Sequence, residues 1–119
     1  MNREDFVHAI KTVVYKGAAK GTIDVLTKPP GKRPALELQK LGQWFQSLRP
    51  EDRNAVIQVA DLAANQATYN FLLILDGLLA VEEIGAKGQL ELIYDDGKMR
   101  LSLNGKGAEE LSMLFKDES

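Results

Sequence analysis

The stretch QLELIYDDGKMRLSL, residues 89–103, decides the fold class, because the apolar residues change there from a helical period to a period of two. Its centre, Asp96-Gly97, is a strong signal for a two-residue hairpin turn in which both residues need a positive φ. We therefore predict an antiparallel hairpin with one apolar face. The predicted register places the following side chains opposite one another: Leu90 and Leu103, Leu92 and Leu101, Tyr94 and Met99.

The remainder of the chain has a helical period. A first helical segment follows an N-cap at Asn2 and ends at the proline-rich loop of residues 28–34. The second begins at Pro34, and the third extends from Pro50 to Gly85 with a kink at Gly77. A short helix with apolar residues 111, 114 and 115 follows the hairpin. The sequence thus predicts an α+β, mostly α fold: a three-helix bundle, a β-hairpin and a short C-terminal helix in a single domain, 1–119.

The helical periods also predict which side chains are buried. Trp44 is expected to be at least half buried, because it shares a stripe with Leu41 and Phe45. The other predicted core positions are Phe6, Ile10, Val13, Val14, Leu38, Leu48, Val56, Val59, Ala60, Ala63, Ala67, Asn70, Phe71 and Ile74. The most apolar run, residues 67–81, falls short of the roughly 20 residues that cross a bilayer, so we interpret it as a buried helix and predict no membrane association.

The chain has one histidine and no cysteine among its 119 residues. Soluble enzymes often build nucleophiles, proton shuttles and tight metal sites from these two residue types. His8 has neither an orienting partner nor a nucleophile near it in the sequence. We therefore predict no catalytic residue, no metal, no cofactor and no enzymatic activity. A carboxylate-dependent enzyme, with Mg²⁺ held by Asp76, Glu82, Glu83 and the hairpin acids, is the least favoured alternative.

Asp76 lies inside the apolar run, where an unpaired carboxylate would cost several kcal/mol. The sequence therefore predicts a partner for Asp76. An ion pair or a hydrogen bond at a helix end is favoured over a catalytic role.

The charges are unevenly distributed along the chain. Residues 1–49 contain nine lysine and arginine against four aspartate and glutamate residues, whereas residues 50–119 contain six against thirteen. The acidic half suggests a surface that steers a basic protein partner. We predict that its partner-binding residues are Glu82, Glu83, Glu91, Asp95 and Asp96. The alternative is a nucleic-acid-linked regulator, which would use the basic loop of residues 28–34 and the neighbouring Lys16, Lys20 and Lys40. This alternative is disfavoured because the loop contains no aromatic residue.

Three pieces of the sequence together resemble a group of short bacterial proteins of unassigned activity: the PPGKRP loop at residues 29–34, the positions Leu38, Trp44, Phe45, Leu48 and Asp52, and FLLILDG at residues 71–77. Some members of that group are immunity proteins paired with secreted toxins. The likeness covers about Val13 to Glu83, and the proline-rich loop is its sharpest part. It implies a cytoplasmic protein-binding role in which a toxin is blocked by occlusion, and it transfers no catalytic residue. The absence of cysteine is consistent with the cytoplasm. The oligomeric state is left open.

Overall fold

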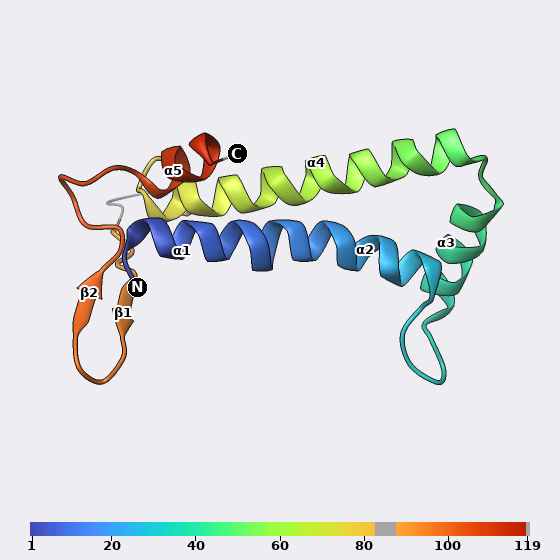
Figure 1. The fold of residues 1–119 in the computed structure, drawn as a ribbon, viewed down its shortest axis with the longest axis horizontal. Coiled ribbons are helices and arrows are strands. Elements are labelled where there is room, and N and C mark those ends of the chain that lie inside the picture. The colour runs from blue at the N-terminus through green and yellow to red at the C-terminus, as the bar shows by residue number, and fades with distance from the viewer. Residues whose placement is uncertain (83–87, 119) are drawn as a thin grey trace. The chain divides into compact units, whose positions relative to one another are not determined.

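The computed structural model describes residues 1–82 and 88–118 and has the predicted mostly helical α+β fold class. The helices and strands follow the predicted order (Figure 1): α1 (Arg3–Ala9), the π-helix η1 (Ile10–Lys16), α2 (Gly17–Thr27), α3 (Leu36–Ser47), α4 (Pro50–Leu75), β1 (Ile93–Asp95), β2 (Arg100–Ser102) and α5 (Leu111–Asp117). In the described ranges, no helix has both the length and the hydropathy that a bilayer crossing requires.

The contacts divide the chain into two compact units. Unit 1 consists of residues 1–12 and 66–119, and unit 2 consists of residues 13–65. The charge asymmetry of the sequence follows this division, since unit 1 has seven basic and twelve acidic residues and unit 2 has eight and five. The prediction of a single domain over residues 1–119 stays a prediction.

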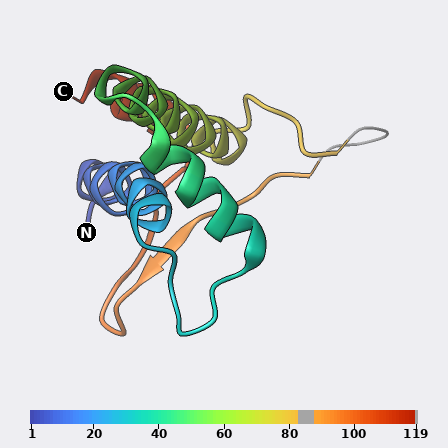
Figure 2. The same ribbon diagram turned by 90° about the vertical axis from the view of Figure 1, so that its right-hand side faces the viewer.

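In unit 2, α3 packs closely against the C-terminal end of α2, and the loop between them extends away from both helices (Figure 2). Gly42 makes this approach possible, because a Cβ atom at that position would lie only 2.8 Å from the carbonyl oxygen of Leu26. The Gln46 side-chain amide donates a hydrogen bond to the Thr27 carbonyl at 2.7 Å. Helix α2 ends at Thr27, just before the two prolines, as predicted.

The core of unit 1 contains the least exposed apolar side chains of the described residues: Val7, Leu72, Leu103, Leu111 and Phe115. Helix α1 packs on α5. The predicted N-cap is present, because Asn2 and Asp5 form a reciprocal capping box at the start of α1. The Arg3 guanidinium donates to the carbonyl oxygens of Gly105 and Glu109, which fixes the segment before α5 on the start of α1.

Helix α4 ends earlier than the sequence predicted. The expected kink at Gly77 and end at Gly85 are wrong, because Gly77 itself terminates the helix with a φ of +77°. The Gly77 N–H donates to the Ile74 carbonyl, and the Leu78 N–H donates to the Leu73 carbonyl. These two bonds form a Schellman motif, which only a residue tolerant of positive φ closes without strain. Leu78, Leu79 and Val81 are therefore not helical.

The predicted buried faces are partly wrong. Val13 and Val14 are exposed, because the wider turn of η1 changes the direction in which successive side chains project. On α4 the less exposed row runs at intervals of four residues through Val56, Ala60, Ala64, Thr68 and Leu72. The predicted core positions Val59, Ala63, Ala67, Asn70 and Phe71 lie outside this row and are exposed. Trp44 is 50% exposed, at the limit of its predicted burial.

The hairpin is present, but the predicted register is wrong by two residues. The observed pairs are Ile93 with Ser102, Tyr94 with Leu101 and Asp95 with Arg100. The Asp96 side chain accepts hydrogen bonds from the backbone N–H groups of Lys98 and Met99, which moves the centre of the turn to residues 97–98. Only Gly97 has a positive φ there, whereas the expected turn required it at Asp96 as well. The apolar face survives, because a two-residue shift keeps every side chain on its side.

Candidate functional site

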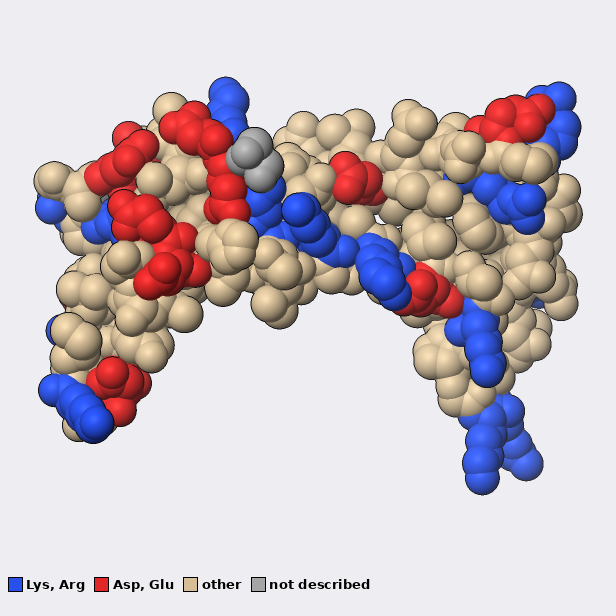
Figure 3. Space-filling view, in the orientation of Figure 1, with Lys and Arg blue, Asp and Glu red and all other residues tan. Residues whose placement is uncertain are grey.

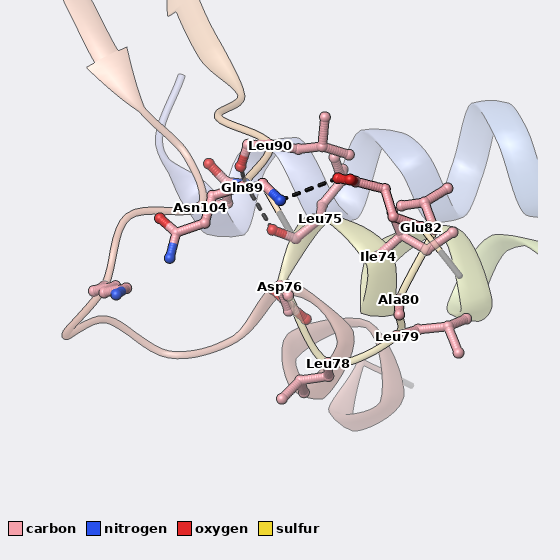
Figure 4. Close-up of a pocket in the computed structure, with 14 residues that line it drawn as sticks. Ile74, Leu75, Asp76, Leu78, Leu79, Ala80, Glu82, Gln89, Leu90 and Asn104 are labelled. Carbon is pink, nitrogen blue, oxygen red and sulfur yellow. Dashed lines mark hydrogen bonds between the residues drawn. The ribbon is translucent and has the colours of Figure 1, made fainter. Parts of the chain in front are cut away.

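Unit 1 contains a cavity of about 520 Å³ just beyond the C-terminal end of α4 (Figure 4). Its walls are the last turn of α4, residues 78–82, residues 88–90, Asn104 and Lys106. This volume lies within the usual range for binding pockets, about 300–1,000 Å³.

Asn104 holds two of these walls together. Its side-chain amide donates to the carbonyl oxygens of Leu75, at 2.6 Å, and Leu90, at 2.8 Å. Its side-chain oxygen accepts a hydrogen bond from the Leu92 N–H at 2.9 Å. One side chain thus satisfies an end carbonyl of α4 and two backbone groups of the chain leading into β1. Sequence reasoning missed this residue, because nothing in a loop asparagine indicates which distant carbonyls it meets.

Asp76 also lines the cavity, but its carboxylate has a structural function. One oxygen accepts from the Leu111 N–H at 2.9 Å, and the other accepts from the Ser112 N–H at 2.8 Å. Glu110, the N-cap residue of α5, makes no side-chain capping bond. Asp76 therefore caps α5 from a position 35 residues earlier, and the predicted helix-end hydrogen bond is confirmed.

Large apolar side chains line the cavity and remain accessible to solvent. Leu78, Val81 and Leu90 each expose more than half of their surface, and Leu79 is exposed as well. Leu78, Leu79 and Val81 lie here because the Schellman motif ends α4 before the apolar run of residues 67–81 is complete. An exposed apolar group of this kind, with charged residues near it, is typical of a binding surface.

The predicted partner-binding acids that the structure describes lie at or beside the cavity and in the hairpin turn. Glu82 lines the cavity, where its carboxylate accepts a hydrogen bond from the Gly88 N–H, and the exposed Glu91 directly follows Leu90. Glu83 lies outside the described residues.

Asp95 and Asp96 instead belong to the hairpin turn. The Asp95 carboxylate accepts from the Gly97 N–H and lies 3.9 Å from Arg100. The backbone N–H groups of Met99 and Lys98 hold the pKa of Asp96 below its ordinary value of 3.8. Both carboxylates therefore help to shape the turn, and neither lines the cavity.

A second acidic group, missed in the sequence, lies where α1 packs on α5 (Figure 3). Glu4, Asp5, Asp117 and Glu118 line a depression there together with His8, whose ring contacts the Glu118 carboxylate. Sequence spacing gave no sign of this group, because its members come from opposite ends of the chain. In residues 1–82 and 88–118, no three acidic or histidine side chains are arranged as metal ligands.

The basic loop between α2 and α3 carries Lys28, Lys32 and Arg33, all exposed (Figure 3). These three side chains form no ion pair with another described residue. The loop therefore provides free positive charge on unit 2.

Comparison with protein-family models, with curated proteins and with solved structures gives no match for this chain. The resemblance to immunity proteins therefore stays a prediction, and a functional proposal depends on the geometry of the chain itself.

Proposed function

We propose that this chain is a cytoplasmic protein-binding module, and most concretely an immunity protein that occludes a functional site of a basic bacterial toxin. The observation that carries the proposal is the exposed apolar group at the end of α4, Leu78, Leu79, Val81 and Leu90, within a unit of twelve acidic and seven basic residues. We call this group the apolar rim.

The apolar rim supports a protein partner because its burial is favourable at about 25 cal/mol per Å² of apolar surface. Protein interfaces commonly combine an apolar centre with a polar or charged periphery. Here Glu82 and Glu91 directly follow two members of the rim, Val81 and Leu90. The excess of acidic residues in unit 1 favours a basic partner, since opposite charge accelerates encounter and disfavours acidic competitors.

A nucleic-acid-linked role is the second candidate, and the free positive charge of Lys28, Lys32 and Arg33 favours it. Such a role would use unit 2, where basic residues outnumber acidic ones by eight to five. Its binding would weaken steeply with salt, because phosphate contacts release counterions.

Capture from a nuclease-treated lysate of the source cell separates these candidates. The full chain carries an affinity tag, and bound proteins are identified by mass spectrometry. We expect the wild type to retain a basic protein that the double variant Leu78→Ser, Leu90→Ser loses.

Met99→Ser is the matched control, because Met99 is as exposed as Leu90 and belongs to unit 1 but does not line the cavity. It should retain the same protein as the wild type. Equal retention by the double variant would show that the apolar rim is not the interface. Recovery of RNA or DNA from an untreated lysate, with no rim-dependent protein, would favour the second candidate.

A further inference from the structure

Asn104 and Gly105 form the one asparagine–glycine pair in the sequence. The other four asparagines, at positions 2, 54, 65 and 70, precede residues that have a side chain. The pair matters chemically because the backbone nitrogen of the residue after an asparagine can attack the side-chain amide. Glycine leaves that nitrogen the least hindered, since it has no Cβ atom and the widest choice of backbone angles.

The structure leaves the nucleophile of this reaction available and restrains the amide that it attacks. The Gly105 N–H donates no hydrogen bond to another described residue. The Asn104 amide nitrogen donates to the carbonyl oxygens of Leu75 and Leu90, and its oxygen accepts from the Leu92 N–H. Attack on Cγ expels the amide nitrogen and so breaks both bonds that this nitrogen donates. The three hydrogen bonds therefore oppose the reaction in the folded chain.

The reaction needs only water as a co-reactant, and Asn104 and Gly105 are both partly accessible to solvent. The Gly105 nitrogen forms a bond to Cγ of Asn104, the bond between Cγ and the amide nitrogen breaks, and that nitrogen leaves as ammonia with the Gly105 proton. The product is a five-membered succinimide ring. Water then adds to one of the two ring carbonyls and opens the ring. The result is aspartate or, where the chain continues through Cγ, isoaspartate.

Conversion of Asn104 removes the donor that two carbonyl oxygens share. An ionised carboxylate has only acceptor oxygens, so it cannot donate to Leu75 or to Leu90. Leu75 is the last residue of α4, and Leu90 belongs to the opposite cavity wall. The carbonyl oxygens would face a negative charge in place of a hydrogen-bond donor, which is costly where water has only partial access. The change therefore separates the two walls that Asn104 holds together.

We propose that Asn104 is a site of spontaneous deamidation, and that its conversion irreversibly detaches the segment leading into β1 from the end of α4. Because the ammonia is lost, closing of the cavity cannot restore the two donated hydrogen bonds. The folded chain delays the reaction, and each local opening of the cavity allows it to proceed. The proposal does not depend on the partner or on the function proposed above.

Peptide mass spectrometry of the full chain, incubated at mildly alkaline pH with and without guanidinium chloride, tests the reaction. Trypsin cleavage after Arg100 and Lys106 releases a peptide in which Asn104 is the one asparagine. We expect this peptide to gain one dalton with time in both conditions, and severalfold faster in the denaturant, where the three hydrogen bonds are broken. A sample digested at the start corrects for conversion during digestion.

The chain contains its own controls for the chemistry. In the denaturant, where only the local sequence matters, Asn54 and Asn70 should convert severalfold more slowly than Asn104, because alanine and phenylalanine follow them. Gly105→Ala should slow the conversion of Asn104 severalfold under the same condition. Absence of conversion in the folded chain would overturn the proposal, and so would equal rates with and without the denaturant.

Hydrogen exchange tests the structural consequence. The converted chain carries one more negative charge, so anion exchange separates it from the starting chain. We expect amide exchange in the converted chain to accelerate most at residues 88–92, and Asn104→Asp to reproduce this change. Asn54→Asp adds the same charge at an exposed position of α4 and should leave the exchange of residues 88–92 unchanged. A converted chain that exchanges like the wild type would refute the detachment.

Discussion

Replacing Asp76 tests how a residue at the end of α4 holds the last helix. In Asp76→Ala, the N–H groups of Leu111 and Ser112 both lose a charged acceptor, and they are only partly accessible to water. Hydrogen bonds to charged groups contribute about 1.5–3 kcal/mol each, and loss of an N-cap costs about 0.5–2 kcal/mol. We expect the free energy of unfolding to fall by about 2–4 kcal/mol, with about half that loss in Asp76→Asn, which keeps one acceptor oxygen.

Urea unfolding followed by circular dichroism measures this change, and the melting temperature should fall by about 8–16 °C. Relative to the wild type, amide hydrogen exchange in Asp76→Ala should accelerate most in α5, which would locate the effect. Glu110→Ala is the control, because Glu110 occupies the N-cap position without a side-chain capping bond. We expect it to cost less than about 0.5 kcal/mol. If Glu110→Ala destabilised the protein as much as Asp76→Ala, the remote cap would not be what holds α5.

Three further substitutions test the packing and the hairpin. Asn104→Ala removes three hydrogen bonds and should lower the free energy of unfolding in urea by about 2–4 kcal/mol. Asn54→Ala, on the exposed side of α4, is the control and should lower it by less than about 1 kcal/mol. Equal losses in the two variants would contradict the role of Asn104. In Gly42→Ala the new Cβ atom would clash with a backbone oxygen, so the free energy of unfolding should fall by about 1–3 kcal/mol. In Gly21→Ala the new Cβ atom has no other atom within 4 Å, so the free energy of unfolding should rise by about 0.5–1 kcal/mol. A change of the same sign in both variants would refute the close approach of α3 to α2. The pKa of Asp96 is lowered from 3.8 in the folded state, so the stabilisation by its carboxylate is present above pH 3.8 and is lost as pH falls through the lowered value. Asp96→Asn should therefore make the free energy of unfolding depend less on pH in this acid range. An unchanged pH dependence would contradict this.

Local signals in the sequence predicted local structure well. The N-cap at Asn2 and the end of α2 before Pro29 are both present, because each depends on a few adjacent residues. The need of Asp76 for a partner was also predictable, since burial of a carboxylate is costly wherever the partner lies. That the partner is the start of α5 was not, because the two are 35 residues apart.

Competing local signals explain the main errors. The Asp96-Gly97 pair predicted a turn centred on itself, but the Asp96 side chain binds the next backbone N–H groups and moves the centre by one residue. The sequence at Gly77 was compatible with either a kink or an end of α4. The helix ends there because the Leu78 N–H donates a hydrogen bond to the Leu73 carbonyl in the last turn. The buried face of α4 depends on which side its neighbours cover. Apolar residues lie on more than one side of α4, so the sequence does not show which side is buried.

The functional account is tested most directly by an association rate. It is the rate at which this chain binds the protein captured through the apolar rim, measured at low and at physiological ionic strength. We expect the rate to fall as salt rises, and Glu82→Lys, Glu91→Lys to slow association most at low salt. Glu37→Lys, Glu51→Lys, the same charge change in unit 2, is the control and should slow it less. Equal rates for the wild type and the Glu82, Glu91 variant at both ionic strengths would contradict the proposal that the acidic surface of unit 1 steers a basic protein partner.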